Sequence, residues 1–210
     1  MGENIIKSLK QKMLLFGLVV FVCVMFVGCN NKTEEMALRL SQLEPTQYKH
    51  PGGFSVSVPG DWQVKEETEN MVFFVDEEDS MTLLLLSEIG GYDYLSLAEA
   101  GQSLVTILEG SLSEIESLSS GPYGQLDDAY KVVCQGEADG TTAIASAIVW
   151  QPLDGVRYYA VFLAGVNDYE EFRQVFDDIC GTIKLYKTQD EIYEAIEATS
   201  GWMRQDAADH

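Results

Sequence analysis

The amino-acid sequence predicts an α+β fold in which an antiparallel β-sheet of about six to seven strands is flanked by helices. Three features support this prediction. Several short segments alternate apolar and polar residues, which is the period of a half-buried strand. Two Asp-Gly pairs, which favour tight hairpins, separate strand-like segments. Two longer segments repeat apolar residues three or four positions apart, as the buried face of a helix does.

The first strands follow one another closely. Residues 54–58 alternate apolar residues with serine, and the turn at 59–61 contains Pro and Gly, which favour a reversal of the chain. Trp62 opens a second strand and is expected to pack in the core. Residues 71–75 form a third strand. The continuous apolar run at 81–86 indicates a central strand that is covered on both faces.

A long helix is expected after Gly90-Gly91. Ser96 and Glu99 have the spacing of a capping box. An apolar stripe continues from there with spacings of three, four or seven, through Leu97, Leu104, Leu108, Leu112 and Ile115. Gly121-Pro122 is predicted to end this helix.

Three further strands are expected at 129–135, 142–150 and 157–166, joined by turns at Asp139-Gly140 and Asp154-Gly155. Because such turns make hairpins, these strands form an antiparallel meander. Two helices follow. The first begins near Asn167 and carries a core-facing stripe through Phe172, Val175, Phe176, Ile179, Cys180 and Ile183. The second is capped by Thr188 with Glu191.

The first 28 residues differ from the rest of the chain. Lys7, Lys10 and Lys12 precede an uncharged run at 13–27, which as a helix would rise only about 22 Å and is too short to span a bilayer comfortably. An uncleaved anchor is the alternative, but the length and the flanks favour an export signal. The segment Phe26-Val27-Gly28-Cys29 resembles the end of a bacterial lipobox. That resemblance implies a palmitate-type acyl anchor on Cys29 and a location at the extracytoplasmic face of a bacterial membrane.

We therefore divide the chain into a lipoprotein signal peptide at 1–28, a tether at 29–47 with a short helix, a domain at 48–187, and a C-terminal helix and tail at 188–210. The formal net charge of −21 repels phosphate backbones, which argues against nucleic acid as a partner. Three of the basic residues and one of the acidic residues lie in 1–28, so the mature chain is more acidic still.

The stretch from Gly53 to Trp62, Gly-Phe-Ser-Val-Ser-Val-Pro-Gly-Asp-Trp, is similar to the opening of the PsbP/Mog1-like superfamily. Residues 157–162 and the helix at 172–183 look like the closing strand and helix of that family. The resemblance spans residues 48–187 and implies an α/β/α sandwich. It also implies protein binding, since family members associate with a photosynthetic membrane complex or with a small GTPase. Some PsbP-like proteins bind divalent metals.

Residues suited to catalysis are few. The chain has two histidines, His50 in a loop expected to be flexible and His210 at the end, and no nucleophile elbow, phosphate loop or Cys-Xaa-Xaa-Cys motif. No cofactor is predicted. The acidic run Asp76, Glu77, Glu78 and Asp79 provides candidate ligands for a divalent metal, but consecutive side chains point in different directions, which favours a solvated turn.

Two further groups of residues are of interest. Cys134 and Cys180 either form a disulfide or are buried free thiols, and the spacing does not decide between them. Trp150 precedes a turn and, with Trp202 and Met203 in the last helix, is a candidate interface residue.

The leading functional hypothesis is a non-catalytic, lipid-anchored interaction or assembly factor that binds a protein partner. The alternative is a lipoprotein that binds a ligand or divalent metal for transport or sensing, which a deep apolar pocket would favour. A third reading, an enzyme of unassigned type, requires His50 to be buried beside a carboxylate and a nucleophile.

Overall fold

The computed structural model describes residues 44–77, 81–89, 95–108, 112–138, 140–188, 190–192 and 194. Lipidation at Cys29, the signal peptide, and the candidate residues Glu78, Asp79, Trp202 and Met203 lie outside these ranges. Within them, no helix has both the length and the apolar character needed to cross a bilayer.

Ten strands and two helices make up most of the described chain. In order, they are β1 (Pro45–Lys49), β2 (Phe54–Pro59), β3 (Gln63–Glu67), β4 (Met71–Val75), β5 (Met81–Ile89), α3 (Leu97–Leu108), β6 (Ser113–Pro122), β7 (Ala129–Ala138), β8 (Thr141–Leu153), β9 (Val156–Gly165), α4 (Val166–Gly181) and β10 (Lys184–Leu185). The predicted α+β class with an antiparallel sheet is confirmed.

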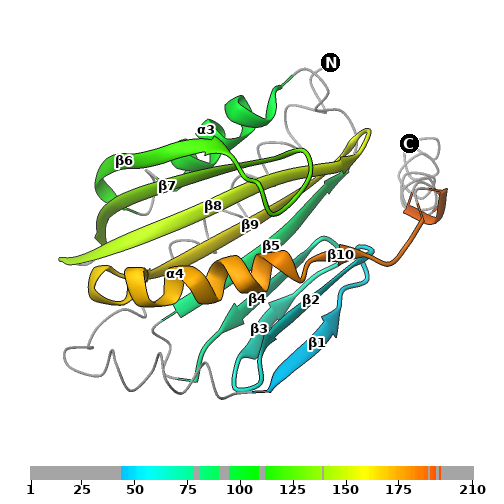
Figure 1. Cartoon of the computed structure of the whole chain (residues 1–210), viewed down its shortest axis with the longest axis horizontal. Helices are drawn as coiled ribbons and strands as arrows, with labels where there is room; N and C mark the ends of the chain where they lie inside the picture. The colour runs from blue at the N-terminus through cyan, green and yellow to red at the C-terminus, as the bar shows by residue number, and fades with distance from the viewer. Residues whose placement is uncertain are drawn as a thin grey trace, which may run out of the picture.

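The strands form two antiparallel sheets rather than one (Figure 1). The larger has seven strands in the order β3-β4-β5-β9-β8-β7-β6. The smaller joins β1, β2 and β10, so the predicted first strand, β2, belongs to the smaller sheet. Strand β1 starts at Pro45, three residues inside the segment that the sequence assigns to the tether. The predicted meander is confirmed, because β7 pairs with β8 and β8 pairs with β9.

Both faces of the large sheet are buried along its central strands. Along β5, Leu83 and Leu85 lie in one apolar cluster, whereas Leu84 and Leu86 lie in the other. Helix α4 and the small sheet cover the first face through residues such as Phe176 and Val56. Helix α3 covers the second face. The prediction that β5 is central and covered on both faces is confirmed, and Trp62 packs in the first cluster as expected.

Helix α3 is shorter than the sequence predicts. Ser96 and Glu99 form the predicted capping box, since Glu99 N–H donates to Ser96 Oγ and Ser96 N–H donates to a Glu99 carboxylate oxygen. The helix ends at Leu108, and residues 113–122 form β6. The extension of the helix to residue 121 is therefore wrong. The apolar spacing persists because Leu112 and Ile115 pack against the same cluster as the helix.

Helix α4 is held to the large sheet by aromatic and ionic contacts. The ring of Phe176 stacks on that of Phe162 in β9, with 4.9 Å between centroids. Asp177 accepts a hydrogen bond from Tyr123 Oη at 3.0 Å and pairs with Lys131 Nζ at 2.7 Å. The helix begins at Val166 after an N-cap at Gly165, so Asn167 is not its cap. Side chains from three separate elements therefore fix the position of this helix.

Candidate functional site

His50 lies in the short connection between β1 and β2 and is fully buried. Its Nε2 is 3.0 Å from the carbonyl of Thr68 and 3.1 Å from that of Met71, and its Nδ1 accepts a hydrogen bond from Gly52 N–H at 3.0 Å. The ring stacks on Phe54 with centroids 4.6 Å apart. The expectation of a flexible loop is therefore wrong, because this histidine links the small sheet to the β3–β4 turn of the large one.

The contacts of His50 do not form a catalytic arrangement. A ring nitrogen that accepts from Gly52 N–H cannot also activate a nucleophile, and the other nitrogen is directed at two backbone carbonyls. Among the described residues, no carboxylate or nucleophile is hydrogen-bonded to the ring. The enzyme hypothesis requires His50 to be buried beside a carboxylate and a nucleophile. His50 is buried, but among the described residues neither kind of partner is hydrogen-bonded to its ring.

The burial of His50 predicts a pH dependence of stability. Burial lowers the pKa of the imidazole from its ordinary value of 6.5, and the Gly52 N–H that points at Nδ1 also opposes protonation. Well above pH 6.5 the ring is neutral in both the folded and the unfolded chain. As the pH falls below 6.5, the unfolded chain binds a proton first, so we expect the free energy of unfolding to decrease, by at most about 1.4 kcal/mol per pH unit.

Urea titrations at several pH values between 7.5 and 5.5 would measure this slope, and the His50→Gln variant provides the comparison. A neutral amide cannot titrate in this range, so the variant is expected to lose the slope that the native chain shows. Equal slopes in the two proteins would contradict the assignment of this pH dependence to His50.

The acidic turn after β4 begins with a structural residue. Asp76 is 3 % exposed, and its Oδ1 accepts a hydrogen bond from Met81 N–H at 2.9 Å, while Asp76 N–H donates to the carbonyl of Met81. The carboxylate therefore closes the connection to β5. Within the described part of the chain, no group of three or more His, Cys, Asp or Glu residues is arranged to hold a metal ion.

Cys134 and Cys180 are free thiols. They cannot be bridged in this fold because Cys134 lies in the cluster under α3, whereas Cys180 lies in the cluster on the opposite face of the large sheet. The disulfide alternative is therefore wrong. Burial raises the pKa of the Cys134 thiol to about 11 and also raises that of Cys180, so neither is a reactive thiolate at neutral pH.

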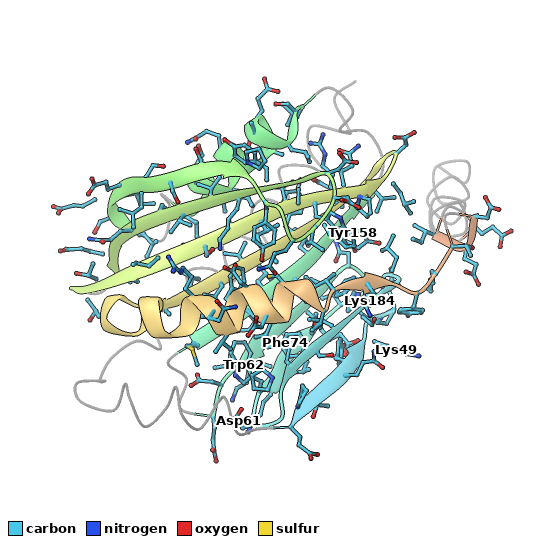
Figure 2. The ribbon with its side chains drawn as sticks, viewed as in Figure 1. Lys49, Asp61, Trp62, Phe74, Tyr158 and Lys184 are labelled. Atoms are coloured by element: carbon cyan, nitrogen blue, oxygen red, sulfur yellow. The ribbon has the colours of Figure 1, made fainter. Side chains whose placement is uncertain are left out.

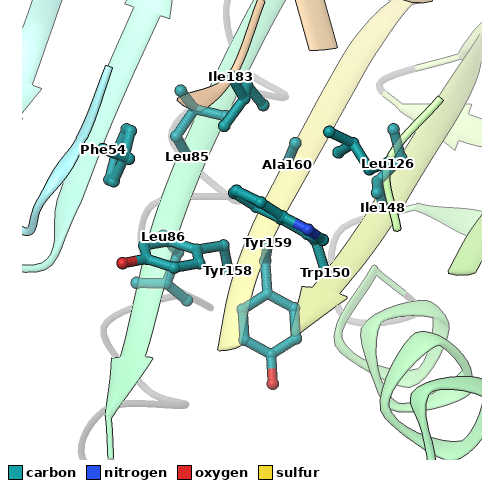
Figure 3. Close-up of a pocket in the computed structure, with 10 residues that line it drawn as sticks. All are labelled: Phe54, Leu85, Leu86, Leu126, Ile148, Trp150, Tyr158, Tyr159, Ala160 and Ile183. Carbon is teal, nitrogen blue, oxygen red and sulfur yellow. The ribbon is translucent and has the colours of Figure 1, made fainter. Parts of the chain in front are cut away.

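Trp150 is also buried, which contradicts its assignment to an exposed interface. It is 9 % exposed, and its ring lies 5.4 Å from that of Tyr158 in β9. Both rings line a small apolar cavity together with Phe54 and Ile183 (Figure 3). The cavity volume is about 10 Å³, enough for about one water molecule at most. This cavity is too small to hold an organic ligand, so it is not the deep apolar pocket that a transport role would require.

The outer face of the small sheet carries an unusual group of cations. Lys49 of β1 and Lys184 of β10 both pair with Ser55, so the three residues form one row across the sheet. Figure 2 shows the two lysines near the same end of that sheet. Lys49 Nζ lies 5.7 Å from the ring centroid of Tyr186, which is 42 % exposed. Lys187 Nζ donates to the carbonyl of Pro51 nearby.

We call Lys49, Lys184, Tyr186 and Lys187 the lysine–tyrosine patch. It combines an exposed aromatic ring, over which Lys49 lies, with two lysines that are close to that ring in the chain, in a protein with a net charge of −21. The sequence did not reveal it, because β1 and β10 are far apart in the chain and meet only through β2. The available local signal was the alternation of Lys184, Leu185 and Tyr186, which places the lysine and the tyrosine on the same side of an extended segment.

The fold resembles that of two solved structures. One is the Ran-binding protein Mog1p of Saccharomyces cerevisiae, with a TM-score of 0.54 and 11 % identity over 69 % of this chain and 96 % of that one. The other is the cyanobacterial PsbP protein of Synechocystis, with a TM-score of 0.50 and 15 % identity over 76 % of this chain and 98 % of that one. No protein-family model and no curated protein sequence matches the chain. These likenesses confirm the PsbP/Mog1-like fold.

Proposed function

We propose that this protein is a non-catalytic interaction or assembly factor, anchored by a lipid on Cys29, that binds an acidic segment of a protein partner through the lysine–tyrosine patch. The observation that carries the proposal is the exposed ring of Tyr186, which has Lys49 over it and lies between Lys184 and Lys187 in the chain. Aromatic residues at the centre of an interface contribute much of its binding energy. Lysines around such a ring attract a negatively charged partner and repel a positively charged one.

The location of the patch agrees with the proposed anchor. The chain enters the small sheet at Pro45, and β1 ends at Lys49. A lipid on Cys29 would therefore be separated from the patch by a short tether and a single strand. Such a connection keeps the patch close to the membrane surface, where a membrane-bound partner is also concentrated.

The resemblance to Mog1p supports protein binding as a use of this fold, because that protein is a Ran-binding protein. The contacts of His50 and the small volume of the apolar cavity argue against the enzyme and apolar-ligand readings. The proposal therefore rests on the surface of the small sheet and not on a cleft.

Site-specific photocrosslinking tests the patch without reacting with its lysines. A benzophenone amino acid would replace Gln47, which is exposed and lies on the same side of β1 as Lys49. In cells that express the full chain, we expect one defined adduct with a partner. The double variant Lys49→Glu/Lys184→Glu should reduce the adduct about tenfold, since a loss of about 1.4 kcal/mol in binding corresponds to that factor.

Two controls make the experiment specific. Lys65→Glu reverses an exposed charge on β3 in the other sheet and should leave the adduct unchanged. The same photoreactive group at Ser119, which is exposed on β6, should give no such adduct. An adduct that survives the double charge reversal, or the absence of any adduct at Gln47, would contradict the proposed contact surface.

A further inference from the structure

A polar cleft lies between the start of α3 and the β8–β9 hairpin. Its volume is about 470 Å³, and it is lined by Leu95, Ser96, Leu97, Gln151, Asp154 and Arg157. It is separate from the lysine–tyrosine patch, whose residues do not line it. Neither the predicted site residues nor the proposed function involves this cleft.

Arg157 is the residue that makes the cleft chemically distinctive. Its side chain is 5 % exposed, which is rare for arginine unless the charge is paired. Nε donates to Gln151 Oε1 at 2.7 Å, and Nη2 donates to the carbonyl of Leu95. Nη1 is buried and has no hydrogen-bond partner among the residues that the structure describes. A guanidinium has five N–H donors, so about three of them are not used by these two bonds.

The hydrogen bonds of Arg157 to described residues do not pair its charge with an anion. Both acceptors, an amide oxygen and a backbone carbonyl, are neutral. Glu88 is the cross-strand neighbour of Arg157 in β5, but its carboxylate accepts a hydrogen bond from the hydroxyl of Tyr159. None of the contacts that Arg157 makes with described residues is to a carboxylate. A buried cation without a counter-ion is costly, and a bound anion would remove that cost.

The surroundings of the cleft restrict the kind of anion. The start of α3 contributes the positive end of a helix dipole, which favours a negative group. Asp154 lines the cleft, the Glu99 carboxylate caps the same helix end, and Glu88 lies across from Arg157 in β5, so three negative charges lie close by. These charges repel a dianion more than a monoanion. A carboxylate carries one charge and matches the planar fork of a guanidinium with two parallel hydrogen bonds.

We propose that this cleft binds the carboxylate of a small organic acid, with Arg157 as the group that recognises it. The carboxylate accepts hydrogen bonds from the guanidinium donors that Gln151 and the carbonyl of Leu95 leave unused. Because Nη1 is buried, this binding requires the guanidinium to turn toward the cleft. This inference does not depend on the proposed protein partner, because it involves other residues on a different part of the surface.

Calorimetric titration of the full chain in detergent tests the proposal, with sodium acetate as the probe, sodium phosphate as the dianion, and sodium chloride at matched ionic strength as the reference. We expect saturable acetate binding that is stronger than phosphate binding. Arg157→Lys keeps the charge but loses the fork, and should weaken acetate binding about tenfold. Arg157→Met should abolish it. Lys65→Met removes an exposed cation on β3 and should leave it unchanged.

Amide chemical shifts provide an independent readout that does not depend on the folding of any variant. Acetate should shift the backbone amide signals of Ser96, Leu97 and Gln151 in the native chain, with a saturation curve that agrees with the calorimetry. The proposal is wrong if acetate does not saturate, if phosphate binds as tightly as acetate, if Arg157→Met binds acetate as the native chain does, or if the largest shifts lie around Lys49 and Tyr186.

Discussion

The Phe176→Ala variant is expected to lower the free energy of unfolding by about 3–5 kcal/mol, the range measured for aromatic residues truncated in a packed core. Phe176 is fully buried and stacks on Phe162, which is also fully buried. Truncation removes this contact and leaves a cavity between α4 and β9. It also withdraws the ring over which Lys131 Nζ lies at 5.5 Å. Because α4 packs on both sheets, a loss at this position weakens the whole first apolar cluster.

Urea unfolding followed by circular dichroism measures this effect. The matched control is Gln174→Ala, two residues earlier in the same helix, where the side chain is exposed and bonds to Asp178. That substitution should change stability by no more than about 0.5 kcal/mol. A loss below about 1 kcal/mol for Phe176→Ala would mean that α4 does not pack on β9 as described.

The Cys29→Ala variant is expected to lose acyl modification and to leave the membrane fraction. The expectation follows from the lipobox-like segment that ends at Cys29. Each buried methylene of an acyl chain contributes about 0.8 kcal/mol to membrane binding, so two or three chains anchor a protein stably and their loss is decisive. Metabolic labelling with an alkyne-bearing fatty acid, followed by fractionation, measures both changes.

Cys23→Ala is the matched control for this experiment. Cys23 lies in the apolar run that precedes Cys29, but it follows the bulky Val22 and not a small residue such as Gly28. This variant should keep both the label and the membrane association. A Cys29→Ala chain that is still labelled and still sediments with membranes would contradict the proposed anchor.

The strands and turns of the large sheet were predictable because their signals are local. The segment 71–75 matches β4 at both ends. The hairpin turns contain Gly140 and Gly155, which have φ values of 77° and 73°, a conformation that glycine adopts without strain. The capping boxes at Ser96 and Thr188 form as their spacing predicts. Each of these features depends on residues within a few positions of one another.

Strand β6 was not predictable in the same way. Leu112 and Ile115 continue the helical spacing of α3, so periodicity alone extends the helix. The feature that favours a strand over a continued helix is Gly136 in β7. A side chain there would place Cβ 2.9 Å from Leu112 Cβ and 3.1 Å from the carbonyl oxygen of Ser113. The glycine allows residues 112 and 113 to lie close to β7. This contact joins residues more than 20 positions apart, so local sequence patterns do not reveal it.

The division into two sheets and the candidate site have the same cause. Strands β1 and β10 join β2 from opposite ends of the domain, and their pairing creates the lysine–tyrosine patch. Likewise, His50 is buried by contacts with β4 and the turn before it, and Trp150 is buried against β9. The residues next to His50 and Trp150 in the sequence do not reveal these contacts. Sequence patterns identified most of the elements, although not β1, β6 or β10, whereas the pairing of distant strands determined which polar residues are exposed.

We propose that a lipid on Cys29 holds this folded domain at a membrane surface, where it binds a partner. Mass spectrometry of the N-terminal peptide of the membrane-bound protein detects such a lipid without any variant. We expect a peptide that begins at Cys29 and carries the mass of a diacylglycerol group. An unmodified peptide that begins at Met1 would contradict the claim.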